Sequence, residues 1–203
     1  MTLHSVSFLY PERPSDADKA LLKRFMVLFR DTITCPYCYQ HFKVIFENYT
    51  KAHPEWVNSR FDFFMFVCRA HNTVNRRLNK PQPDSVSSCI QRFTDNTKVT
   101  SALTYRMKYL DYLTRNYGME LSGDSMMKIA SVREMRKIMN EYWNTLPDTG
   151  TTTFRMDADV LDYINESPST RQIMTSGGSL STISASPAMR VGLQGGRFRL
   201  RNG

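Results

Sequence analysis

The four cysteines are the residues of this 203-residue chain whose type and spacing point most directly to chemistry. Cys35 and Cys38 form a Cys-Pro-Tyr-Cys motif, whereas Cys68 and Cys89 stand further along the chain. Two cysteines with two residues between them can exchange electrons by closing into a disulfide, or can supply half of a tetrahedral zinc site. The opening residues lack a secretory signal pattern, so we expect a protein that is not secreted, in which redox or metal chemistry is favoured.

Zinc binding is one interpretation of the motif. After Cys35 and Cys38, a gap of 29 residues leads to Cys68 and His71, and both pairs have the ligand spacing of structural zinc sites. Cys89 would then have no partner. On spacing alone, a zinc-binding nucleic-acid module therefore stays open beside a redox enzyme.

Helices are the elements that must position these residues. Between Pro54 and Leu78, residues recur at alternating steps of four and three, which indicates one face of one long helix: Val57, Phe61, Phe64, Cys68, His71, Asn75 and Leu78. The first half of this face is apolar. The second half aligns Cys68, His71 and Asn75, which apolar packing alone does not require.

Similar patterns predict helices along most of the chain. Ser15 is a candidate N-cap for a helix that follows it, and Pro36 suits the first turn of a helix that begins at the Cys-Pro-Tyr-Cys motif. A helix start lowers the pKa of a nearby thiol. Further helices are predicted over residues 84–93, 98–117, 124–145 and 156–164. No segment has the period of a β-strand, so the predicted fold class is all-α.

Three stretches, in the same order along the chain, resemble one known family. HNTVNRRLNKP (71–81) matches the pattern His-Asn-x-Val-Asn-x-x-Leu-x-Lys-Pro, LHSVSFLYPERPS (3–15) is similar to a first-helix stretch, and CPYCYQHF (35–42) is similar to an active-site Cys-x-x-Cys that opens a helix. Together they resemble the Erv/ALR family of FAD-linked sulfhydryl oxidases over residues 3–90.

The resemblance implies a fold, a cofactor and a reaction. It implies a four-helix bundle with a short fifth helix, and FAD held in the mouth of the bundle. Cys35 would accept electrons from the dithiol of a client protein, and Cys38 would face the flavin, which passes the electrons to O2 and yields H2O2. By position, the implied FAD-binding residues are His4, His71, Asn72, Asn75 and Lys80.

The same resemblance implies a homodimer and a structural disulfide between Cys68 and Cys89, although two unpaired buried thiols remain the alternative. Compact members with one Cys-x-x-Cys occur in large DNA viruses, so a viral member is expected, located in the host cytoplasm or the virion. A non-enzymatic virion structural or interaction protein on a degenerate oxidase fold is the competing class.

Charge and composition divide the chain into three predicted regions. These are an oxidase domain over residues 1–97, a helical extension over 98–146 and a Ser/Gly/Arg-rich flexible arm over 147–203. Residues 167–203 contain five arginines and no acidic residue, so of the net charge of +8 only +3 belongs to the remainder. This basic tail predicts nucleic acid or another acidic partner, unless it only aids solubility. No apolar run approaches the roughly 18 residues that span a bilayer.

Overall fold

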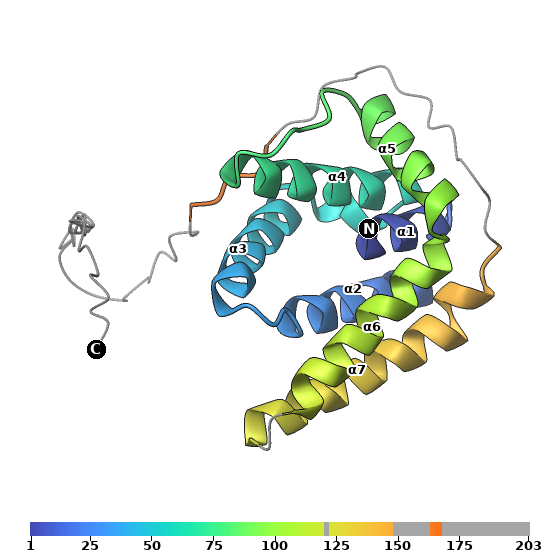
Figure 1. Ribbon diagram of the computed structural model, residues 1–203. Coiled ribbons are helices and arrows are strands. Elements are labelled where there is room, and N and C mark those ends of the chain that lie inside the picture. Colours follow the sequence, from blue (N-terminus) through green and yellow to red (C-terminus); the bar gives the residue numbers. More distant parts are fainter. Residues whose placement is uncertain (120–121, 148–162, 168–203) are drawn as a thin grey trace, which may run out of the picture. The chain divides into compact units, whose positions relative to one another are not determined.

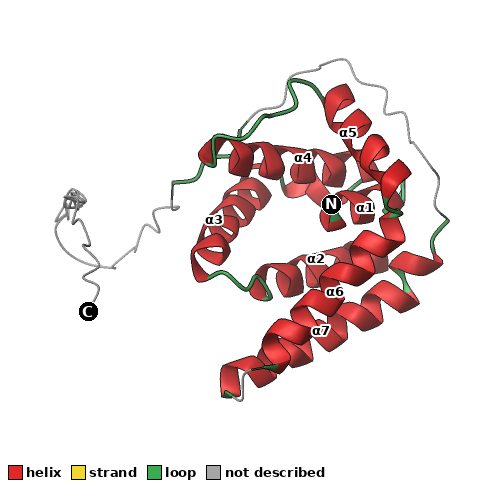
Figure 2. Ribbon diagram, in the orientation of Figure 1, coloured by secondary structure: helices red, strands yellow, loops and turns green. Residues whose placement is uncertain are grey.

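The computed structural model describes residues 1–119, 122–147 and 163–167. Within these residues the secondary structure is entirely helical, which confirms the predicted all-α class (Figures 1 and 2). The elements are α1 (Thr2–Leu9), α2 (Asp16–Asp31), α3 (Pro36–Ala52), the 3-10 turn η1 (Pro54–Val57), α4 (Arg60–Arg77), α5 (Val86–Val99), α6 (Ala102–Gly118), α7 (Gly123–Glu141) and the 3-10 turn η2 (Trp143–Thr145).

Side-chain caps define where the helices begin. Ser15 accepts a hydrogen bond from the backbone N–H of Asp18, whose carboxylate in turn accepts from the backbone N–H of Ser15, so α2 starts with a complete capping box. Four later helices also begin at a serine whose side chain accepts a hydrogen bond from a backbone N–H of the first turn: Ser59, Ser85, Ser101 and Ser122. Each such cap stabilises its helix by about 1 kcal/mol.

Two of these caps divide segments that the sequence pattern predicts as continuous. The long helix predicted from Pro54 is interrupted, because η1 ends at Val57 and Ser59 caps the start of α4. The helix predicted over 98–117 is divided as well, since α5 ends at Val99 and Ser101 caps α6. Hydrophobic spacing continues across both breaks, so the spacing alone does not reveal them.

One hydrophobic core joins the first four helices to α6 and α7. Trp143 is fully buried, and its ring lies 5.8 Å from the ring of Phe25 on α2 and 6.1 Å from that of Tyr10. In Figure 1, α6 and α7 run side by side, α7 packs along α2 and α6 packs against α1. The predicted division at residue 97 falls within α5 and stays a prediction.

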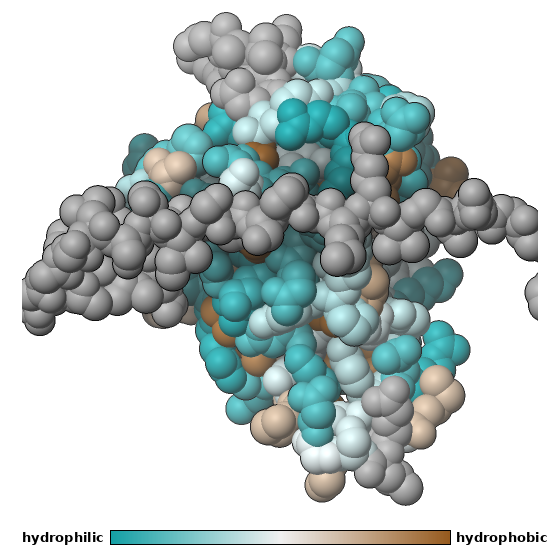
Figure 3. Space-filling view, turned by 90° about the vertical axis from the view of Figure 1, so that its left-hand side faces the viewer, coloured by the Kyte–Doolittle hydropathy of each residue, from teal (hydrophilic) through white to brown (hydrophobic). Residues whose placement is uncertain are grey.

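The surface of the described residues is mostly polar. On the face in Figure 3, hydrophobic residues form small separate patches among hydrophilic ones. None of the described helices is long and apolar enough to cross a membrane. The predicted flexible arm and the helix predicted over 156–164 lie almost entirely outside the described residues.

Candidate functional site

The Cys-Pro-Tyr-Cys motif begins α3. Cys35 is the N-cap of this helix, and its Sγ accepts a hydrogen bond from the backbone N–H of Cys38 at 3.2 Å. Pro36 occupies the first turn, where its missing N–H costs little. Both thiols are exposed to solvent. The pair is therefore accessible to thiols of another protein.

The two thiols differ in acidity. A hydrogen bond donated by the Cys38 thiol, followed by one from the Cys38 backbone, lowers the pKa of Cys35. The same thiol–thiol hydrogen bond raises the pKa of Cys38. When the pair is reduced, Cys35 is therefore the sulfur that ionises first.

A two-part cavity lies beside α3 and α4. One part, of about 330 Å³, is bounded by polar, charged and apolar side chains from α4, α5 and the segment between them, and it is called the polar part because it contains the charged ones. The other, of about 300 Å³, is bounded mainly by apolar and aromatic side chains. Met1, His4 and His71 line both parts, so the two are adjacent. The polar part is lined by Asn75, Lys80, Arg92 and Asn96, and the apolar part by Phe29, Phe42, Val67, Val74 and Tyr109.

Helix geometry relates this cavity to the redox motif. Cys38 and Phe42 are four residues apart on α3, so they lie on one face of the helix. Phe42 lines the apolar part of the cavity. Cys38 is therefore on the cavity side of α3, although both cysteines are exposed.

Two histidines stand where the two parts of the cavity meet. His4 Nε2 and His71 Nδ1 share a hydrogen bond of 3.0 Å. Burial, then the N-terminal amine, lowers the pKa of both imidazoles, and it lowers that of His4 strongly. His4 Nδ1 is buried and has no hydrogen-bond partner among the residues that the structure describes. The pair is therefore neutral at pH 7, and one buried polar atom remains free to meet a bound group.

The structure brings together four of the five residues expected to bind the cofactor: His4, His71, Asn75 and Lys80 line the polar part of the cavity. Asn72 has another environment. Its side chain is buried, and its Nδ2 donates a 3.0 Å hydrogen bond to the backbone oxygen of Pro83. It anchors the segment between α4 and α5.

The model of the Erv1 / Alr family matches residues 1–99. A putative FAD-linked sulfhydryl oxidase, 347L of Invertebrate iridescent virus 6, is 31% identical over 96 residues, which cover 45% of this chain and 86% of the relative. The chain belongs to the Erv1/Alr family.

Cellular members of the family are also similar to part of the chain. A mitochondrial FAD-linked sulfhydryl oxidase of Saccharomyces cerevisiae is 37% identical over 82 residues, or 40% of this chain and 41% of the relative. An FAD-linked sulfhydryl oxidase of Arabidopsis thaliana is 35% identical over 78 residues, or 38% of this chain and 39% of the relative. The chain thus spans about two fifths of the length of these curated relatives. No solved structure matches the chain.

The second pair of cysteines of this Erv1/Alr chain is at the cavity, because Cys89 lines its polar part. Cys68 on α4 and Cys89 on α5 are buried free thiols, and their sulfurs and a ring nitrogen of His4 all lie within 4.8 Å of one another. This closeness supports the predicted disulfide, which stays a prediction. The zinc alternative, with Cys35, Cys38, Cys68 and His71 as ligands, is not assembled. Among the described residues, the group close enough to share a metal ion consists of His4, Cys68 and Cys89.

A segment from far along the chain also lies beside α3 and α4 of the Erv1/Alr unit. Figure 1 shows residues 163–167 passing close to the end of α4. Ile164 of this segment belongs to the main cluster of buried residues. The Glu166 carboxylate lies 3.6 Å from Nε of Arg77. The Arg77 cation makes a minor contribution that lowers the pKa of Cys35. The segment therefore places a carboxylate next to a cation that acts on the redox pair.

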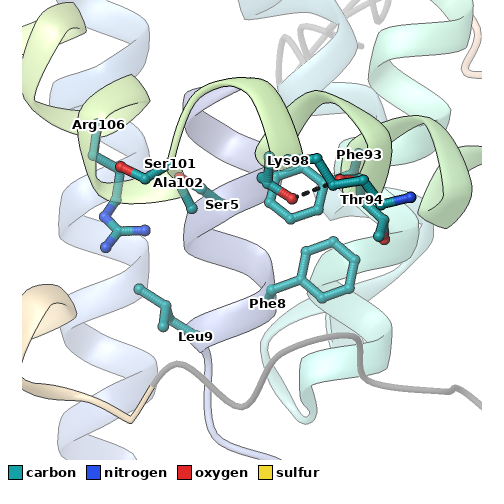
Figure 4. Close-up of a pocket in the computed structure, with 10 residues that line it drawn as sticks. Ser5, Phe8, Leu9, Phe93, Thr94, Lys98, Ser101, Ala102 and Arg106 are labelled. Atoms are coloured by element: carbon teal, nitrogen blue, oxygen red, sulfur yellow. Dashed lines mark hydrogen bonds between the residues drawn. The ribbon is translucent and has the colours of Figure 1, made fainter.

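A separate cavity of about 390 Å³ lies between α1, α5 and α6. Figure 4 shows Phe8 and Phe93 facing each other on one side of it, with Arg106 on the other. None of the predicted site residues lines it. It is not part of the site described above.

Sequence reasoning missed several residues of the two-part cavity. Arg92 and Asn96 lie on α5, which the motifs do not reach, and Tyr109 lies on α6, beyond the residues that match the family model. The position of Arg92 three residues after Cys89, on the helix predicted over 84–93, was a signal available for it. For Tyr109 there was none, because its position depends on how α6 packs.

Proposed function

We propose that this protein is an FAD-dependent thiol oxidase that forms disulfides in client proteins. The observation that carries the proposal is the position of the exposed Cys35–Cys38 pair. The pair begins a helix, and that helix lines a cavity bounded by His4 and His71. The relatives named above as FAD-linked sulfhydryl oxidases support the same activity.

The cavity suits FAD in its shape and chemistry. A flat apolar ring system fits the part lined by Phe29 and Phe42, since cofactor sites are mainly apolar with a few fixed polar groups. In the polar part, Lys80 and Arg92 are cations suited to phosphate oxygens. The unpartnered Nδ1 of His4 would gain a hydrogen-bond partner from a bound cofactor. These residues would hold the cofactor.

The chemistry of the protein's own residues is thiol–disulfide exchange. With the pair oxidised, a client thiolate attacks Sγ of Cys35, the Cys35–Cys38 bond breaks, and Cys38 leaves as a thiolate. A second client thiolate then attacks the client sulfur of the mixed disulfide. Cys35 leaves, which its lowered pKa favours, and the client disulfide forms. The client has lost two electrons, which the Cys35–Cys38 dithiol now holds.

FAD, when bound, supplies the acceptor for these two electrons and transfers them to O2, which becomes H2O2. The protein's part is to hold Cys38 on the cavity side of α3 and to keep His4 and His71 neutral beside the cofactor. Oxidation of the dithiol restores the Cys35–Cys38 disulfide for the next client.

The test is a visible absorption spectrum of the purified full-length protein. We expect a flavin band that bleaches when a dithiol is added and returns in air. Cys35→Ser should abolish turnover and leave the flavin bound, because Cys35 does not line the cavity. A colourless protein that cannot be loaded with FAD would overturn the proposal and favour a non-enzymatic virion or interaction protein.

Several finer proposals belong with this function. A viral origin, with a host-cytoplasm or virion location, is supported by the high coverage of the iridescent-virus relative. A homodimer and an acidic or nucleic-acid partner for the tail at 167–203 rest on the sequence alone. Nucleic-acid binding would weaken steeply with salt, and binding that persisted after deletion of residues 167–203 would exclude the tail.

A further inference from the structure

The α6–α7 hairpin (Ala102–Glu141) contributes to the cavity although it lies beyond the residues that match the Erv1/Alr model. Tyr109 on α6 lines the apolar part together with Phe29 of α2 and Phe42 of α3. Its ring lies 5.3 Å from the ring of Phe29, with an angle of 32° between their planes. Three helices therefore each supply one aromatic ring to the wall of the same cavity.

The position of Tyr109 is fixed by the packing of its neighbours. Leu110, which follows Tyr109 directly, and Leu113, one turn further along α6, are fully buried. The hydroxyl of Tyr117 donates a 3.2 Å hydrogen bond to the backbone oxygen of Thr32. α6 is thus held against the end of α2, and Tyr109 is kept at the cavity.

The same helix pair holds the turn that leads into Cys35. Tyr112 shares a 2.9 Å hydrogen bond with Thr34, the residue directly before Cys35. Lys128 of α7 donates a hydrogen bond to the backbone oxygen of Asp31. The hairpin therefore contacts both the cavity wall and the approach to the redox motif, so it is placed to act on the site.

We propose that Tyr109 is a cofactor-binding residue, whose ring packs against the apolar ring system of the bound FAD, and that the α6–α7 hairpin is a working part of the oxidase site. The proposal rests on the proposed function. An aromatic ring in an apolar wall binds a flat aromatic ligand through offset stacking or edge contact in addition to area burial. The Tyr109 hydroxyl is not required for this contact.

The test measures how tightly flavin-free full-length protein binds added FAD. Quenching of the flavin fluorescence reports the binding. Tyr109→Ala and Tyr109→Leu should each raise the Kd about tenfold, because both remove the ring and the leucine keeps apolar bulk. Tyr109→Phe should bind like the unmodified protein. Tyr105→Ala removes a ring one turn earlier on the same helix that does not line the cavity. It is the matched control and should also bind normally.

Each outcome decides a different point. Normal FAD affinity in Tyr109→Leu would overturn the inference while the proposed function stands. Equal weakening in Tyr105→Ala would also overturn it, since the effect would then come from general loosening of α6. If the unmodified protein binds no FAD, the proposed function fails and this inference fails with it. Circular dichroism of each variant shows that it is folded.

Discussion

At the level of single residues, the hydrogen bond between the two cysteines of the motif is directional. Cys38 donates and Cys35 accepts, so the two thiols differ in pKa although both are exposed. A sulfur with a lowered pKa is the better leaving group in thiol–disulfide exchange. This asymmetry matches the roles that family resemblance implies, with Cys35 as the outer and Cys38 as the inner cysteine.

The first prediction concerns the acidity of Cys35. Cys38→Ala removes the thiol donor that is the largest cause of the lowered pKa, so the pKa of Cys35 should rise. The curve of iodoacetamide alkylation rate of Cys35 against pH, measured on the reduced proteins, should then shift to higher pH in the variant. An unchanged profile would mean that the backbone N–H of residue 38 is sufficient by itself.

The second prediction concerns His4, whose pKa is well below 6.5 in the folded protein because of burial. The unfolded chain binds this proton more tightly, so the unfolding free energy of flavin-free protein should fall as the pH drops below 6.5. One such group contributes up to about 1.4 kcal/mol per pH unit. Urea denaturation at pH 7 and pH 5 measures the change. His4→Gln, the control, should flatten this dependence, and an equally steep dependence in that variant would contradict the assignment to His4.

At the level of elements, the contacts that attach α7 and the turn after it to α2 include an apolar one and an ionic one. Trp143, in η2, is fully buried against Phe25. Glu134 forms an ion pair with Arg24, but the exposed fraction of the side chain is 39% for Glu134 and 52% for Arg24. Apolar burial should therefore contribute much more to the attachment than the ion pair does.

The third prediction compares these contacts. Trp143→Ala should lower the unfolding free energy by about 3–5 kcal/mol, because it leaves a large cavity in the core. Glu134→Gln should lower it by less than about 1 kcal/mol, because solvent screens a partly exposed pair. Denaturant melts of both variants give the values. A similar loss for the two would show that α7 is held mainly by charge.

At the level of the whole molecule, the extension and the family-matched helices share one core. Leu110, Met135 and Trp143 belong to the same cluster of buried residues as Leu22 and Phe25 of α2. The part that matches the family model therefore lacks, by itself, the partners that cover its α2 face. The chain should behave as one cooperative unit over its described helices.

The fourth prediction tests this unity by truncation. A protein ending at residue 99 should unfold without a sharp transition or aggregate, because removal of α6 and α7 exposes the apolar side of α2. A protein ending at residue 169 should melt cooperatively. Thermal melts and size-exclusion chromatography compare the two. A 1–99 protein that melts sharply as a stable homodimer would contradict the prediction and support the dimer that the family resemblance implies.

Sequence by itself determined the fold class and most of the site. Helical periodicity aligned Cys68, His71 and Asn75 on one face, and α4 places all three at or beside the cavity. The ordered motifs identified the family and led to Cys35 and Cys38 as the proposed redox pair. These features are local, because spacing along one helix fixes which residues share a face.

Tertiary structure decided the features that depend on contacts between distant segments. Asn72 belongs to the motif, but its side chain donates a hydrogen bond to the backbone oxygen of Pro83. The helix breaks at Ser59 and Ser101 could not be predicted, because the hydrophobic spacing continues across them. Only packing brings Tyr109 to the cavity, since no local pattern encodes which face of α6 meets α2 and α3. The sequence thus determined the helices and the chemistry, whereas the burial of shared apolar faces decided which helices form the site.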